Sequence, residues 1–151
     1  MSVNPDFRDL FVALNDAKTR YLLVGGYAVA FHAQPRFTKD LDIWVEPSPD
    51  NAEHVFSALE SFGAPLTNIS PTDLSKPGLI LQIGIPPNRI DIITAIAEVD
   101  FKEAWAARQV TNYGDQSIYV ISREHLIRNK RAVGRPQDNI DADLLDQSAE
   151  D

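Results

Sequence analysis

The sequence predicts an α/β fold of the α+β kind, in which a mixed central sheet is flanked by helices. Two observations support this class: short apolar runs typical of buried strands alternate with segments that carry helix-start signals. A third is the length of 151 residues, which suits one hydrophobic core, with no internal repeat or linker to divide it. We therefore expect a single domain over residues 1–151, with an acidic C-terminal tail from about residue 138.

Helix starts are marked by capping residues and prolines. Asn4, Pro5 and Asp6 supply an N-cap, a proline at the first helical position and an early acid, which predicts a helix to about residue 17. Residues 48–50 (Ser-Pro-Asp) repeat this pattern for a helix that Gly63 ends. The other expected helices are one after Gly25-Gly26, one opened by the capping-box pattern of Asp100 and Glu103, one from Ser122 to about Ala132 that Gly134 and Pro136 end, and one over residues 140–147.

Strands fill the intervals between these helices. The predicted strands cover residues 21–24, 41–45, 79–85, 89–94 and, at an edge of the sheet, 117–121. The segment Pro86-Pro87-Asn88 has the composition of a hairpin turn, whereas residues 64–78, rich in Pro, Ser, Thr and Gly, read as a loop. We expect the hairpin 79–94 to lie beside strand 41–45.

Composition excludes several kinds of site. There are no cysteines, which excludes disulfides, thiol nucleophiles and thiolate metal sites. No apolar run approaches the roughly 20 residues of a membrane span, and the N-terminus lacks the features of a signal peptide. We therefore expect a cytoplasmic protein with no membrane partner. A net charge of −8 disfavours non-specific nucleic-acid binding, because phosphate neutralisation supplies most of that affinity.

Basic residues are concentrated near the C-terminal end despite the acidic balance. Five of the 14 lie within 13 residues: Arg123, Arg128, Lys130, Arg131 and Arg135. Such a cluster could bind one small polyanion, or it could be the solvated face of a helix.

Two aspartates, Asp40 and Asp42, lie one residue apart at the strand predicted over 41–45, and Asp91 lies between isoleucines in strand 89–94. Because side chains alternate along a strand, Asp40 and Asp42 share a face, and Asp91 joins them if the two strands pair. Three carboxylates about 6 Å apart repel by roughly 3 kcal/mol per pair at an effective dielectric of 20. Mg²⁺ suits such oxygen ligands, so we interpret the three as a magnesium or manganese site. The alternative is an Asp-x-Asp that caps a turn or faces solvent.

Gly25 and Gly26 follow an apolar strand and precede Tyr27-Ala28-Val29-Ala30, a strand–turn–helix pattern. Backbone N–H groups at such a helix start bind phosphate well. Glycines at this kind of junction also serve packing alone. The segment has neither the lysine of a P-loop nor the third glycine of a dinucleotide fingerprint.

These segments together resemble the nucleotidyltransferase superfamily typified by DNA polymerase β. The match consists of Gly25-Gly26, 13 intervening residues, Asp40-Leu41-Asp42, and the later Asp91. Residues 36–43, RFTKDLDI, are similar to a bacterial branch of AbiEii-type toxins and small nucleotidyltransferases, and residues 126–138 supply a second match. The resemblance spans roughly residues 20–145 and implies a minimal nucleotidyltransferase fold.

The resemblance implies roles for the matched positions. Gly25 and Gly26 would bind the β and γ phosphates of an NTP, such as ATP, through backbone N–H groups. Asp40, Asp42 and Asp91 would bind Mg²⁺, and Asp91 would also act as the general base.

Four further residues are implied nucleotide-binding positions. Lys130 would reach the triphosphate as a point charge. Thr38 belongs to the same motif as the first two aspartates, and Arg36 would contact phosphate or pair with an acid such as Asp40. Arg135 would contact phosphate, or would instead bridge to Asp138 and pin the last two helices.

The implied activity is Mg²⁺-dependent transfer of NMP from an NTP to an acceptor hydroxyl, with release of pyrophosphate. The acceptor would be a small molecule, a partner protein or an RNA end, bound by one chain or by a homo-oligomer. One alternative is a toxin–antitoxin component that acts by protein–protein binding and keeps a residual or regulatory nucleotide site. Another is an NTP or metal sensor without turnover.

Overall fold

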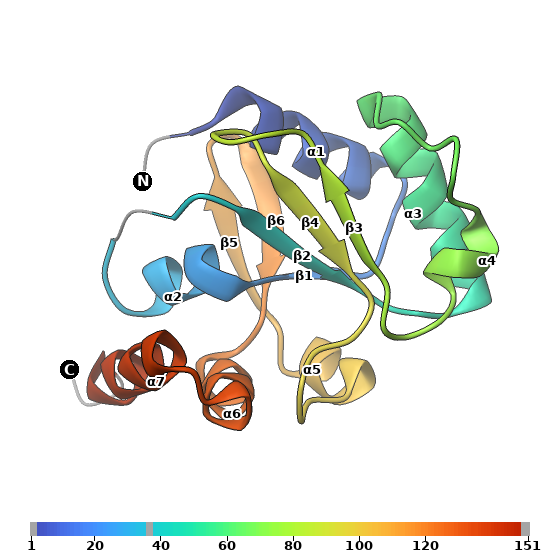
Figure 1. Cartoon of the computed structure of the whole chain (residues 1–151). Coiled ribbons are helices and arrows are strands. Elements are labelled where there is room, and N and C mark those ends of the chain that lie inside the picture. The colour runs from blue at the N-terminus through green and yellow to red at the C-terminus, as the bar shows by residue number, and fades with distance from the viewer. Residues whose placement is uncertain (1–2, 36–37, 149–151) are drawn as a thin grey trace.

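The computed structural model describes residues 3–35 and 38–148, and its described residues form one six-stranded mixed sheet with helices around it (Figure 1). The strands are β1 (Tyr21–Val24), β2 (Leu41–Val45), β3 (Ile80–Ile83), β4 (Ile90–Ile93), β5 (Gln109–Tyr113) and β6 (Gln116–Val120). The helices are α1 (Pro5–Asp16), α2 (Gly25–His32), α3 (Pro49–Phe62), α4 (Pro71–Leu74), α5 (Phe101–Ala106), α6 (Arg123–Val133) and α7 (Pro136–Ser148). The predicted fold class is confirmed.

The sheet has the strand order β3-β4-β2-β1-β6-β5. β2 pairs antiparallel with β1 and parallel with β4, and β4 forms an antiparallel hairpin with β3. The expected position of the hairpin beside residues 41–45 is therefore confirmed. The register places Asp42 opposite Val24 on one side and opposite Asp91 on the other, so the centre of the sheet brings the candidate residues together.

The core lies between the sheet and the helices. Alternate residues of β2 (Leu41, Ile43 and Val45) are fully buried, and α1 and α3 pack against each other on one side of the fold. In Figure 1, α5, α6 and α7 lie at the opposite end, and no helix stands in front of β3 and β4 in this view. No described helix is long and apolar enough to cross a membrane.

The predicted caps form as expected. The side chain of Asn4 accepts hydrogen bonds from the N–H groups of Asp6 and Phe7, and Ser48 and Ser122 cap α3 and α6 in the same way. Gly63 ends α3 with a φ of 91°, in the left-handed region that glycine favours.

The sequence-based assignment was wrong in four places, and one of them is β5, a strand that it did not predict. The strand predicted at the edge, 117–121, is β6, which lies inside the sheet because β5 pairs on its outer side. The loop predicted over 64–78 contains the short helix α4. The last helix begins at Pro136 rather than at residue 140, because Pro136 takes the first helical position instead of only ending α6.

Candidate active site

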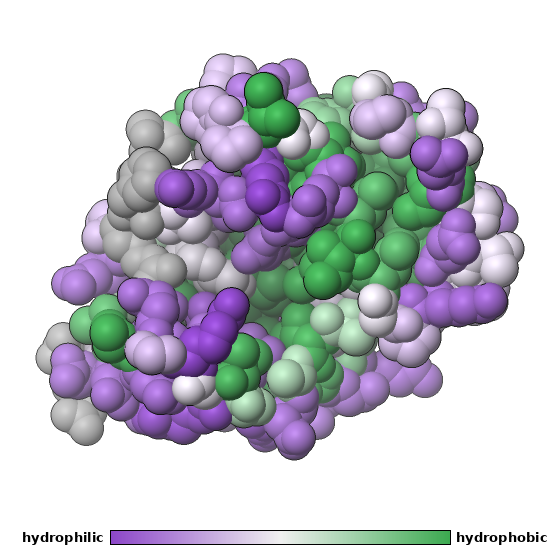
Figure 2. All heavy atoms as spheres, in the orientation of Figure 1, coloured by the Kyte–Doolittle hydropathy of each residue, from purple (hydrophilic) through white to green (hydrophobic). Residues whose placement is uncertain are grey.

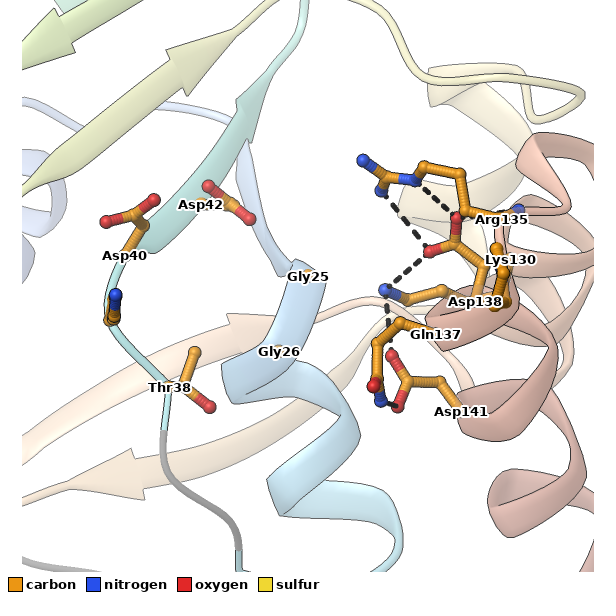
Figure 3. A pocket seen from close by; sticks show the side chains of 12 residues that line it. Gly25, Gly26, Thr38, Asp40, Asp42, Lys130, Arg135, Gln137, Asp138 and Asp141 are labelled. Atoms are coloured by element: carbon orange, nitrogen blue, oxygen red, sulfur yellow. Dashed lines mark hydrogen bonds and ion pairs between the residues drawn. The ribbon is translucent and has the colours of Figure 1, made fainter.

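A cavity of about 680 Å³ separates the ends of β1 and β2 from helices α6 and α7 (Figure 3). Seven of the predicted site residues line it: Gly25, Gly26, Thr38, Asp40, Asp42, Lys130 and Arg135. Lys39, Pro136, Gln137, Asp138 and Asp141 complete the lining. Asp91 is absent from the lining but lies next to Asp42 across the β2–β4 pairing, and Arg36 falls outside the described residues.

The two glycines open helix α2 directly at the end of β1, as the strand–turn–helix pattern predicts. Gly25 has a φ of +69°, which disfavours any side chain. A Cβ atom at this position would also overlap the carboxylate of Asp42. Glycine is therefore needed at residue 25 both for the turn and for the approach of Asp42 to the N-terminus of α2.

The carboxyl groups of Asp42 and Asp91 are paired across neighbouring strands. Burial, together with the charges of Asp91 and Asp40 and a hydrogen bond with Asp91, raises the pKa of Asp42 to about 7. The positive charge of Lys130, on the other side of the cavity, acts on this pKa in the opposite direction. Asp42 and Asp91 are therefore held so close together that Asp42 is hard to ionise unless a cation lies nearby.

Arg89 is a site residue that the sequence analysis missed. Its Nε atom lies 3.4 Å from Oδ1 of Asp91 and 3.8 Å from Oδ2 of Asp40, so one guanidinium faces both carboxylates. Arg89 precedes β4 by one residue and is two residues before Asp91, a spacing that places both side chains on the same side of an extended chain. The two-residue spacing between Arg89 and Asp91 could have identified Arg89 from the sequence, because the same spacing places Asp40 beside Asp42.

The arrangement of the acidic side chains shows whether the described residues already form a metal site. Within residues 3–35 and 38–148, no group of three or more acidic or histidine side chains is arranged to hold a metal ion. Asp40 instead lies ahead of β2 and faces Arg89, whereas Asp42 and Asp91 face each other. The metal role of the three aspartates stays a prediction.

The opposite wall of the cavity is built from α6 and α7. Nζ of Lys130 lies 3.3 Å from Oδ1 of Asp138 and 3.2 Å from Oδ2 of Asp141, and both carboxylates are buried. Arg135 reaches the same Asp138 at 2.7 Å, so the predicted contact forms, but Arg135 lies between α6 and α7 and the ion pair is local to the start of α7. This contact holds the pKa of Asp138 below its usual range.

Figure 3 shows how the two walls relate. Asp40 and Asp42 lie on one side, Lys130 and Arg135 on the other, and Gly25 and Gly26 lie between them. An anion in this space would meet the N–H groups of a helix start and two basic side chains, with carboxylates at one flank. The geometry suits a polyanion accompanied by a cation.

Solved structures with this architecture include antibiotic-modifying enzymes. One is the lincosamide antibiotic adenylyltransferase LnuA with lincomycin bound, at 20% identity and a TM-score of 0.61, over 97% of this chain and 98% of that one. Another is ANT(2″)-Ia with adenylyl-2″-tobramycin, at 14% identity and a TM-score of 0.62, over 95% and 87%. A Thermotoga maritima protein assigned to the nucleotidyltransferases matches at 14% identity and a TM-score of 0.62, over 92% and 91%.

The chain has the nucleotidyltransferase-like fold. At these identities the likeness establishes the fold and leaves the activity to be argued from the site. No family model matches the sequence, and a search of curated protein sequences finds no relative. The resemblance to AbiEii-type proteins stays a prediction.

Proposed function

We propose that this protein is a nucleotidyltransferase that moves NMP from an NTP to an acceptor hydroxyl and releases pyrophosphate. The observation that carries the proposal is the pairing of Asp42 with Asp91 beside the glycine turn, with Lys130 across the cavity. The solved structures with this fold support it, because two of them are adenylyltransferases or hold an adenylylated product.

The triphosphate would lie between the two walls. Backbone N–H groups at Gly25 and Gly26 would donate to its β and γ phosphates, where the partial positive charge of the α2 N-terminus adds to the attraction. Lys130 and Arg135 line the opposite side and would bind the same phosphates, as would Thr38 at the remaining edge. Ion pairs with acids of α7 hold Lys130 and Arg135 before the nucleotide arrives, so orientation is the main contribution of the chain.

A divalent cation fits this site on the chemistry of its donors. Asp42 and Asp91 are oxygen ligands of the kind that Mg²⁺ and Mn²⁺ take, and the raised pKa of Asp42 reflects negative charge that a cation would offset. Asp40 would be the third ligand. When bound, such an ion neutralises phosphate charge and lowers the pKa of the attacking hydroxyl.

Asp91 is the residue to which we assign the proton. The acceptor oxygen would form a bond to the α-phosphorus, the bond from that phosphorus to the pyrophosphate oxygen would break, and the hydroxyl proton would pass to Asp91. Arg89 contacts Asp91 at 3.4 Å and would hold its carboxylate in the orientation for this step.

A thermal-shift experiment with each of the four NTPs, with and without Mg²⁺, tests the proposal. Nucleotide at about 100 times Kd adds roughly 2.7 kcal/mol, which should raise Tm by several degrees for a domain of this size. Asp42→Asn should lose the Mg²⁺-dependent part of the shift. Asp143→Asn, which changes an exposed acid of α7, should keep it.

Product analysis separates the proposal from binding alone. Release of pyrophosphate from the preferred NTP, together with an acceptor that gains the mass of NMP, is the expected result. A nucleotide-dependent shift without any transfer would favour the alternatives of a sensor or of a toxin–antitoxin component. The absence of a shift with every NTP would overturn the proposal.

A further inference from the structure

The register of β2, β4 and β3 arranges side chains in two rows on one face of the sheet. Asp42, Asp91 and Gln82 are partners across the three strands, and we call them the polar row. Two positions away, forward along β2 and β4 and backward along the antiparallel β3, Trp44, Ile93 and Ile80 are partners in the same way and form the apolar row. Because side chains alternate, both rows lie on the same face, about 7 Å apart.

The apolar row is covered at one end and open at the other. Trp44 is 2% exposed and packs edge-to-face against Phe101 of α5, with ring centroids 4.9 Å apart. Ile93 is partly buried, and Ile80 on the outer strand is 65% exposed. Figure 2 shows the result as a hydrophobic surface over β3 and β4, directly beside hydrophilic side chains. Its position beside the candidate reaction centre makes this surface a candidate binding site.

A second cavity ends the apolar row at its covered end. It has a volume of about 450 Å³, and Trp44, Thr94, Val99 and Phe101 are among its lining residues. The indole Nε1 of Trp44 has no hydrogen-bond partner among the described residues. The volume lies in the range of small-molecule sites, and an occupant with an oxygen near Trp44 could accept the missing hydrogen bond.

We propose that the acceptor of the transfer is an uncharged small molecule that carries its hydroxyl on an apolar body, and that the apolar row binds this body. The inference rests on the proposed function, because the hydroxyl must reach Asp91 in the polar row. Ile93 and Ile80 offer a sugar–phosphate backbone neither a charge nor a hydrogen-bonding side chain, which disfavours an RNA end. A protein partner needs about 800 Å² on each side, far more than three side chains supply.

In the transfer step that this placement implies, a residue of the chain itself accepts the proton of the acceptor hydroxyl. With the apolar body on Ile93 and Ile80, the hydroxyl lies one row away, at Asp91. Its proton passes to that carboxylate as the oxygen bonds to the α-phosphorus and pyrophosphate leaves. The apolar row therefore selects the acceptor without taking part in the chemistry.

Binding of two glucosides to protein labelled in the isoleucine methyl groups tests the inference by NMR. Phenyl β-D-glucoside and methyl β-D-glucoside offer the same hydroxyls and differ in the apolar group. We expect the phenyl compound to shift the Ile80 and Ile93 signals and to bind about tenfold more tightly, since a ring buries on the order of 50 Å² more apolar surface. The signal of Ile85, 79% exposed on the same hairpin, should not move.

Matched variants sharpen the test. Ile80→Ser should abolish the preference for the phenyl compound, and Ile85→Ser should retain it. Equal binding of the two glucosides, no shift with the phenyl compound, or the same loss in both variants would overturn the inference. A sedimentation coefficient that falls only in Ile80→Ser would assign the surface to a second copy and would overturn it as well.

The two proposals fail in different ways. Ile80→Ser should still show the thermal shift with Mg²⁺ and NTP, because residue 80 is outside the nucleotide cavity. If wild-type protein prefers the phenyl compound but responds to no NTP, the proposed function is overturned. If it responds to NTP but shows no preference, only the acceptor inference is overturned.

Discussion

The two walls of the cavity between the sheet and helices α6 and α7 differ in their balance of charge. On the sheet wall, Arg89 lies within ion-pair distance of Asp40 and Asp91, and Asp42 lies against Asp91. On the helical wall, two basic side chains of the α6–α7 region meet two buried acids of α7 at ion-pair distance. The sheet wall therefore holds negative charge in excess, and the helical wall is balanced.

This difference distinguishes the acids of the sheet wall, whose excess charge a ligand would offset, from the ion pairs of the helical wall, which also stabilise the fold. An excess of like charge is a cost that a folded chain keeps where binding or catalysis uses it. A balanced, buried cluster is stable only as a set, because removing one member leaves the others uncompensated. Variants on the two walls should therefore change stability in opposite directions.

The largest effect is expected from Lys130→Met on the helical wall. Methionine keeps the length of the side chain but leaves Asp138 and Asp141, with side chains 3% and 0% exposed, without this cation. We expect the free energy of unfolding to fall by about 3–5 kcal/mol, measured by urea denaturation at pH 7.5.

Arg131→Met is the matched control on the same helix. Arg131 pairs with Asp143 and Asp146 while 46% of its side chain is exposed, so its loss should cost less than about 1 kcal/mol. Equal costs for the two variants would show that burial of the Lys130 cluster does not matter.

The next largest effect has the opposite sign and lies on the sheet wall. Asp42 has its pKa raised to about 7 in the folded state, against 3.8 for the free side chain, so the folded state binds its proton more tightly. The stability that this proton confers is present at pH 4 and is lost as the pH rises through 7. An asparagine side chain at this position would resemble the protonated acid at every pH.

We therefore expect Asp42→Asn to be more stable than the wild type by about 2–4 kcal/mol above pH 7 without divalent cations, and nearly equal to it at pH 4. Urea denaturation over this pH range measures the difference. Saturating Mg²⁺ with nucleotide should narrow this difference, since only the wild type gains the Mg²⁺-dependent part of the stabilisation. A difference that is constant from pH 4 to 8 would contradict the assigned pKa.

The features of this site that could be predicted are those that a short segment of the sequence determines by itself. The strand alternation of Asp40 and Asp42 and the apolar flanks of Asp91 are local, and the pairing of β2 with β4 followed from them. The caps at Asn4, Ser48 and Ser122 are also local, and all three form.

The features that sequence reasoning missed depend on tertiary neighbours. β5 reads Gln-Val-Thr-Asn-Tyr and lacks an apolar alternation, because it is an edge strand held by β6. Pro136 is equally able to end one helix or begin the next, and only the packing of α7 on α6 decides. The paired acids around Lys130 required the same helix contact, so the balance of that wall was not visible in the sequence.

A smaller effect is expected where the sheet wall meets the glycine turn. Gly25→Ala places a Cβ against the carboxylate of Asp42 at a φ of +69°, whereas Gly63→Ala has a φ of +91° and open space around it. Both should lose about 1–2 kcal/mol from the left-handed backbone. Only Gly25→Ala should also displace Asp42, and hence lose the Mg²⁺-dependent nucleotide shift. Identical nucleotide responses would show that the close approach is not needed for binding.

The smallest effect on stability is expected from Arg135→Ala, because 74% of the Arg135 side chain is exposed. Asp138 keeps Lys130 at 3.3 Å and the backbone N–H of residue 135 at 3.2 Å, so the loss should stay below about 1 kcal/mol.

The stability that the Arg135–Asp138 ion pair confers changes with pH in the opposite direction to the stability conferred by the proton on Asp42. Arg135 lowers the pKa of Asp138, so the stability it confers is present above the ordinary pKa of an aspartate and is lost as the pH falls through the lowered value. Arg135→Ala should therefore lessen the acid sensitivity of unfolding. Because Arg135 also lines the cavity, its removal should raise the Kd of the nucleotide by more than the stability change accounts for. Isothermal titration with the preferred NTP, beside urea denaturation of the same variant, measures both, and an unchanged Kd would assign Arg135 to the fold alone.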